Sequence, residues 1–97
     1  MATLSTHILD TASGRPASGV AVSLEKDGTV IARGVTDGDG RIAQLAGNLG
    51  AGRYRLVFEL EGRFFRRVAL DIEIGSDPKY HVPLLVTPFG VTSYRGS

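Results

Sequence analysis

The chain has no cysteine, so it can form neither disulfide bonds nor thiolate metal sites. It also has almost no net charge, since 11 basic and 10 acidic residues leave a balance of +1. An interspersed, nearly neutral set of charges does not indicate nucleic acid as a partner. No apolar run reaches the length of a membrane-spanning helix, and the first nine residues lack a signal-peptide pattern. We therefore expect a cytoplasmic protein that binds neither nucleic acid nor a membrane.

Short alternating segments separated by turn residues are what the sequence does contain. Thirteen glycines and four prolines divide 97 residues into pieces that fit one small domain, residues 1–97. Apolar residues alternate with polar ones in the segments 20–25, 54–60 and 68–74, as in half-buried strands. Lys26-Asp27-Gly28 predicts a hairpin turn. The pattern predicts an all-β antiparallel sandwich of seven to eight strands, with at most a short helix between Ile42 and Leu49.

Two glycine-rich or acidic motifs in the middle of the chain do not fit the sites that they superficially match. Residues 38–43 read GDGRIA, the dinucleotide-binding spacing, but no buried parallel strand precedes them and no long helix follows. Asp37 and Asp39 have the spacing of a calcium loop, yet Arg41 stands where a further oxygen ligand is needed. We interpret this stretch as a turn. His7 and His81 could bind a metal together with an aspartate, but two histidines without any cysteine disfavour such a site, and we predict none.

The two histidines lie on strand faces opposite the more continuous apolar rows. If Leu4 and Ile8 enter the core, His7 points outward, and His81 is opposite the row that begins at Tyr80. Leu9, Pro83 and Leu85 share the histidine faces, which suggests a subunit interface or a pocket. Spacing alone favours two ordinary surface histidines.

The final residues, Tyr94-Arg95-Gly96-Ser97, are an unusual ending because exposed chain ends are normally small, polar and disordered. Tyrosine and arginine are good anchors, and glycine allows close backbone approach. A tail that folds back would bring the Ser97 hydroxyl and carboxylate toward the histidines.

Several of these segments together resemble the transthyretin-like 5-hydroxyisourate hydrolases. The resemblance covers the opening residues 4–11 and 14–17, the central Asp39-Gly40-Arg41, the YHVPLL of residues 80–85, Pro88-Phe89-Gly90 and the closing YRGS. It implies a transthyretin-type (prealbumin-like) β-sandwich, and it implies a homotetramer, a dimer of dimers with active sites at the dimer–dimer interface. One departure is the short connection 61–67, where the family usually has a longer segment with a helix; Arg66-Arg67 replaces the usual Pro-Glu.

The resemblance also implies the activity and the residues that carry it. The family opens the lactam ring of 5-hydroxyisourate, the product of urate oxidase, to 2-oxo-4-hydroxy-4-carboxy-5-ureidoimidazoline, without a metal or an organic cofactor. Carried over position by position, the catalytic residues are His7, Arg41, His81 and Ser97. Substrate binding falls to His7, Arg41, Tyr94, Arg95, Gly96 and Ser97, with Tyr94 and Arg95 also expected to pin the tail.

Two other functions compete with the hydrolase. Transthyretin itself has this fold and carries hydrophobic hormones between its subunits, so a small-ligand carrier without catalysis is the alternative. The histidine pair and the YRGS ending separate this chain from that branch. A structural or adhesive sandwich module is a third possibility, which the same ending disfavours.

Overall fold

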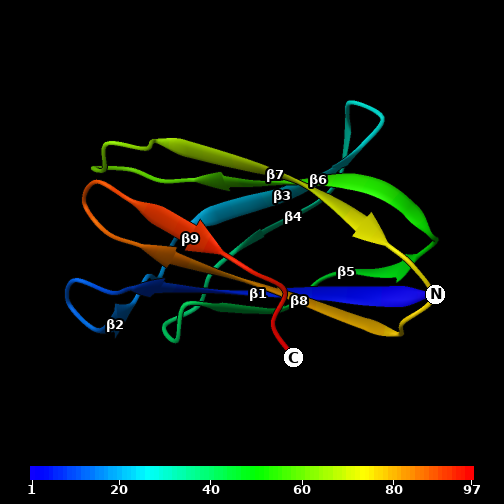
Figure 1. Cartoon of the computed structure of the whole chain (residues 1–97), viewed down its shortest axis with the longest axis horizontal. Helices are drawn as coiled ribbons and strands as arrows, with labels where there is room; N and C mark the ends of the chain where they lie inside the picture. Colours follow the sequence, from blue (N-terminus) through cyan, green and yellow to red (C-terminus); the bar gives the residue numbers. More distant parts are fainter.

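The computed structural model describes residues 1–97 as two β-sheets packed face to face, with no helix (Figure 1). One sheet contains β1 (Ala2–Asp10), β2 (Arg15–Pro16), β5 (Arg41–Leu49), β8 (Lys79–Val86) and β9 (Val91–Ser93). The other contains β3 (Ala21–Lys26), β4 (Thr29–Val35), β6 (Gly52–Glu59) and β7 (Arg67–Ile74), in the order β4-β3-β6-β7. The predicted all-β sandwich is confirmed. None of its elements is a helix that could span a membrane.

The core lies between the two sheets and is made by the alternating apolar rows. Leu4 and Ile8 of β1 and Leu84 of β8 meet Leu24 of β3 and Phe58 of β6, and all five side chains are inaccessible to solvent. Since side chains alternate along a strand, this packing fixes which residues of β1 and β8 face away from the core.

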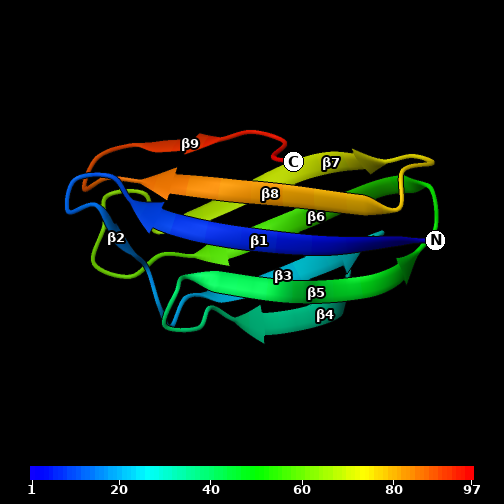
Figure 2. The same ribbon diagram turned by 90° about the horizontal axis from the view of Figure 1, so that it is seen from below.

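The strand count and the pairing differ from the prediction in two respects. The two-residue β2 and the three-residue β9 bring the number of strands to nine. The ladder between β1 and β8 is parallel, from Thr3 opposite Lys79 to Asp10 opposite Val86, whereas the other ladders are antiparallel. In Figure 2, which faces this sheet, β1 and β8 lie side by side at its centre. A parallel pair joins strands that are far apart in sequence, so turn signals cannot reveal it.

The segment between Ile42 and Leu49, where the sequence allowed at most a short helix, is strand β5. Its partners in β1 are Ala2 for Leu49, Leu4 for Ala46 and Thr6 for Ile42, with register shifts between them. Two residues of β1 are therefore matched by three or four of β5, as in β-bulges. The bulges replace a spacing of two by spacings of three and four, which is the spacing of a helix face.

The connection between β6 and β7, which is shorter than the helix-bearing segment usual in the family, is a turn without a helix. An Arg63–Asp10 ion pair of 2.7 Å ties the turn to the end of β1. The Phe64 amide donates to the Pro88 carbonyl at 3.1 Å, which ties it to the β8–β9 connection. The shortened connection is thus fixed by contacts to the sheet that carries the histidines.

Candidate active site

The outer face of the β1–β8 sheet brings together three of the predicted catalytic side chains. Because Leu4, Thr6 and Ile8 are buried, Ser5 and His7 of β1 point away from the core. In the register of the sheet His7 is paired with Arg41 of β5. On the other side of β1, Ser5 is paired with His81 of β8. The expectation that both histidines lie opposite the core is confirmed, and the topology places Arg41 in the same group.

His81 is held by a hydrogen bond that sequence reasoning did not identify. Its Nδ1 lies 2.8 Å from the Ser5 hydroxyl oxygen. Partial burial lowers the pKa of His81 below its usual value of 6.5, and the nearby charges of His7 and Arg41 lower it further, against the opposing effect of hydrogen bonding to Ser5. The imidazole is therefore neutral at pH 7, the form that can accept a proton.

Arg41 is positioned by the turn that precedes β5. The Asp37 carboxylate accepts hydrogen bonds from the amides of Asp39 at 2.9 Å and Arg41 at 3.0 Å, and the Asp37 amide donates to the Arg41 carbonyl. Gly40 has φ +71° and packs against the Ile8 carbonyl, where a Cβ would approach to 2.4 Å. The interpretation of GDGRIA as a turn is confirmed for Gly38, Asp39 and Gly40, whereas Arg41, Ile42 and Ala43 begin strand β5. Arg41 is exposed and makes no ion pair within the chain, so its guanidinium is free for a ligand.

The closing residues return to the edge of β8. The Gly96 amide donates to the His81 carbonyl at 2.7 Å, an isolated bridge beyond the β8–β9 ladder. A Cβ on Gly96 would lie 2.8 Å from His81 Cδ2 and 3.1 Å from Pro83 Cγ, so only glycine fits this approach without a shift. In Figure 1 the red tail crosses toward the outer side of the β1–β8 sheet, as the folded-back ending predicted.

A cavity of about 850 Å³ lies beside these groups. Arg41, His81, Gly96 and Ser97 line it together with Ser5, Thr6, Ile42, Ala43, Gln44, Thr3, Lys79, Tyr80 and Arg95. The cavity therefore collects residues from β1, β5, β8 and the tail. Ser5, Gln44 and Lys79 are polar lining residues that the sequence did not single out. Ser5 had one available signal, its position two residues before His7 on the same strand face.

Three of the predicted site residues, His7, Tyr94 and Arg95, do not present a free side chain to this cavity. His7 is close enough to affect His81 electrostatically but is not part of the cavity wall. Tyr94 is 55% exposed, makes no hydrogen bond and lines a smaller hollow of about 330 Å³ beside β7. The Arg95 guanidinium is engaged by Asp77 at 3.0 Å. Of the two residues expected to anchor the tail, only Arg95 makes polar anchoring contacts.

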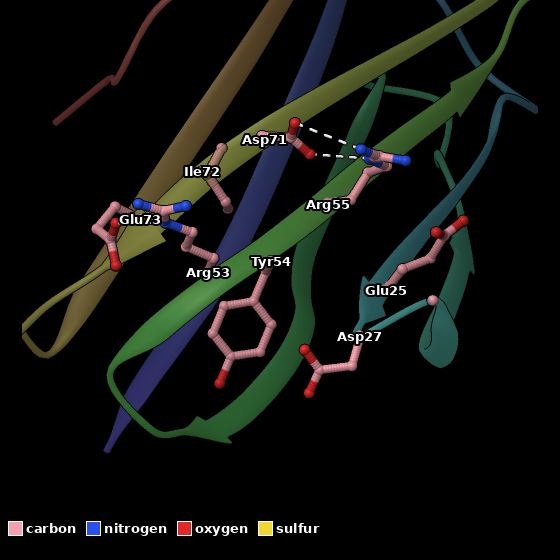
Figure 3. A pocket seen from close by; sticks show the side chains of 9 residues that line it. Glu25, Asp27, Arg53, Tyr54, Arg55, Asp71, Ile72 and Glu73 are labelled. Carbon is pink, nitrogen blue, oxygen red and sulfur yellow. Dashed lines mark hydrogen bonds and ion pairs between the residues drawn. The ribbon is translucent and has the colours of Figure 1, made fainter.

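A second hollow, of about 450 Å³, lies on the opposite sheet (Figure 3). Charged side chains of both signs line it, and they are Glu25, Asp27, Arg53, Arg55, Asp71 and Glu73. Arg55 pairs with Asp71 at 2.8 Å and Arg53 with Glu73 at 3.5 Å. These exposed pairs neutralise one another, and neither histidine lies there. The two histidines and Arg41 lie instead on the sheet that contains β1 and β8.

Comparisons with a family model and with known proteins point to the same family. The model of the HIUase/Transthyretin family matches residues 4–96. A 5-hydroxyisourate hydrolase from Caulobacter vibrioides is 41% identical, with all of both chains covered.

Solved structures with the same fold include both a hydrolase and a hormone carrier. The 5-hydroxyisourate hydrolase of Klebsiella pneumoniae superposes with a TM-score of 0.92 at 44% identity, with all of both chains covered. Sea bream transthyretin, solved in complex with thyroxine, gives 0.86 at 30% identity, with 97% of this chain and 94% of that chain covered.

Proposed function

This chain belongs to the HIUase/Transthyretin family, and on that premise we propose that it hydrolyses the lactam ring of 5-hydroxyisourate. The hydrolase relatives are 41% and 44% identical to it over their full length, against 30% for the thyroxine-bound transthyretin. The observation that carries the proposal is His81, a neutral imidazole bonded to Ser5 on the wall of a cavity that also holds Arg41 and the tail. A carrier needs no such group.

In the proposed mechanism His81 is the general base. Because Nδ1 faces the Ser5 hydroxyl, Nε2 is the ring nitrogen that remains free to take a proton from water. The resulting hydroxide adds to the lactam carbonyl carbon, and the ring C–N bond then breaks. The departing nitrogen takes a proton from an imidazolium, so water is consumed and the acid–base groups return to their starting state. A positioned acid–base group contributes about a hundred- to ten-thousand-fold to such a reaction.

The remaining predicted residues have complementary roles in this proposal. Arg41, exposed and without an ion pair, stabilises the negative charge that develops on the carbonyl oxygen. His7, beside Arg41 in the sheet, shares the proton transfers with His81. Gly96 and Ser97 contact the substrate from the tail side of the cavity. Tyr94, which lines the smaller hollow beside β7, is given no direct contact with the substrate in this proposal. These groups supply all the acid–base chemistry of the reaction, so no metal or organic cofactor is invoked.

We further propose that the active protein is a homotetramer, a dimer of dimers. The histidine face of the β1–β8 sheet also presents Leu9 and Leu85, both half-buried in a single chain. Such a mixed face gains stability when a second copy covers it, and a second copy would also exclude water from the substrate. A cytoplasmic location stays a prediction.

A direct assay distinguishes the hydrolase from the carrier. 5-Hydroxyisourate is generated from urate with urate oxidase, and its ultraviolet absorbance is followed with and without this protein. We expect the protein to accelerate the decay at catalytic, substoichiometric concentration. A decay rate equal to the spontaneous one, together with saturable binding of an iodinated thyronine, would instead establish the carrier.

A further inference from the structure

Arg95 is held at three points by Asp77, in the connection before β8, and by the first two residues of β8, Lys79 and Tyr80. Its guanidinium donates to the Asp77 carboxylate at 3.0 Å and to the Lys79 carbonyl at 3.4 Å. The same group lies over the Tyr80 ring, 4.4 Å from the ring centroid. A planar guanidinium suits this combination of a directed ion pair and a stacked face. Arg95 is thus engaged within its own chain.

The Tyr80 ring that supports Arg95 is itself fixed. Only 8% of Tyr80 is exposed. Its hydroxyl accepts hydrogen bonds from the amides of Gly75 at 2.7 Å and Asp77 at 3.3 Å. The loop that carries the Asp77 carboxylate is therefore tied to the same side chain on which the guanidinium rests. Asp77, Tyr80 and Arg95 form one connected unit, which we call the clasp.

The clasp lies directly beside the contact between the tail and His81. Tyr80 precedes His81 in β8, and Arg95 precedes Gly96, whose amide donates to the His81 carbonyl at 2.7 Å. Beyond the last β9 residue, Ser93, that backbone bond and the clasp are the hydrogen bonds and ion pairs that hold the tail. One backbone hydrogen bond contributes little net stability, so it cannot by itself order four terminal residues.

We propose that the clasp positions Gly96 and Ser97 against His81, which makes Asp77 and Tyr80 positioning residues for catalysis. The inference rests on the proposed hydrolysis for its functional consequence, but not for the ordering of the tail. The family resemblance implied that Arg95 binds substrate. In this proposal Arg95 acts instead by holding the tail, and with it Gly96 and Ser97, in place. Asp77 never touches the substrate, and its effect on turnover passes through Arg95.

The size of the expected effect follows from the exposure of the pair. The side chains of Arg95 and Asp77 are 55% and 59% exposed, so solvent weakens their attraction. Loss of the carboxylate charge in Asp77→Asn should therefore reduce kcat/KM by about two- to fivefold. Arg95→Ala also removes the stacking on Tyr80, and we expect a loss of about tenfold or more.

The test compares Asp77→Asn with Asp77→Glu and with a matched control. Asp77→Glu keeps the charge and should restore most of the effect. The control is Glu59→Gln, which removes one carboxylate charge from the similarly exposed Arg67–Glu59 pair on the other sheet. Two readouts are measured for each variant: amide hydrogen exchange of Gly96, which is independent of activity, and kcat and KM for 5-hydroxyisourate.

We expect Asp77→Asn to accelerate Gly96 exchange and to lower kcat/KM, with Asp77→Glu and Glu59→Gln close to the unmodified protein. Unchanged Gly96 exchange in Asp77→Asn would overturn the clasp. Faster exchange with unchanged kinetics would overturn its role in catalysis. If the unmodified protein fails to hydrolyse 5-hydroxyisourate, the proposed function fails, while the exchange measurement still decides whether the clasp orders the tail.

Discussion

The lowered pKa of His81 predicts how both the activity and the stability of the protein depend on pH. Since its pKa in the folded chain is lowered below 6.5, we expect kcat/KM to rise with pH through that lowered pKa and to be level above 6.5. The unfolded chain binds the proton more tightly, so the contribution of His81 to stability is complete above pH 6.5 and is lost as pH falls through the folded pKa. An NMR titration of the His81 ring measures this midpoint. A midpoint above 6.5 would contradict the assignment.

Ser5 acts through His81, and its removal tests that link. Ser5→Ala deletes the hydroxyl at 2.8 Å from Nδ1 and should cost about one hydrogen bond, roughly a three- to tenfold loss in kcat. The pH profile should shift as well, because the ring loses its fixed partner. Ser76→Ala, in the exposed loop before β8, is the matched control. A shift in the pH profile of Ser76→Ala, or none in Ser5→Ala, would argue against the link.

For single residues, the sequence predicted which side chains point away from the core, but not which of them contact each other. The alternation around Leu4 and Ile8 was sufficient to place His7 on the outer face, as the structure confirms. The bond between Ser5 and His81 joins residues 76 positions apart. It depends on the parallel register of β1 and β8, which no local pattern encodes. For Tyr94 the prediction failed in a different way. Its residue type predicted that it anchors the tail, but its side chain is largely exposed.

Among the elements, the turn before β5 positions Arg41 in the site. Gly40→Ala places a side chain at φ +71° and drives its Cβ into the Ile8 carbonyl, so we expect a loss of more than about 1 kcal/mol in stability. Because Arg41 follows directly, kcat/KM should fall as well. Gly38→Ala meets no atom within 4 Å and should be nearly neutral. Thermal unfolding measures both variants, and equal melting temperatures would contradict this account.

Element type was predictable where a local signal determined it. The Lys26-Asp27-Gly28 turn joins β3 to β4 as predicted, with positive φ at Asp27 and Gly28. Strand β5 was not predictable, because its bulges against β1 give Ile42, Ala46 and Leu49 the spacing of a helix. Only the partner strand determines that such spacing belongs to a bulged strand.

For the whole molecule, the proposal predicts an assembly of four copies. Sedimentation equilibrium should give four times the chain mass of 10.3 kDa at micromolar concentration. Replacing Leu85 on the histidine face by a charged residue, Leu85→Glu, should shift the protein toward smaller species and reduce activity in parallel. A fully active monomer would contradict the proposal that a second copy closes the site.

The measurement that tests the account most directly is the ultraviolet decay of 5-hydroxyisourate with His81→Asn beside the unmodified protein, at pH 7 and equal concentration. The account predicts that kcat falls by at least about a hundredfold while the circular dichroism spectrum and melting behaviour stay those of the folded sandwich. A folded His81→Asn variant that hydrolyses 5-hydroxyisourate at the unmodified rate would contradict the assignment of His81 as the base.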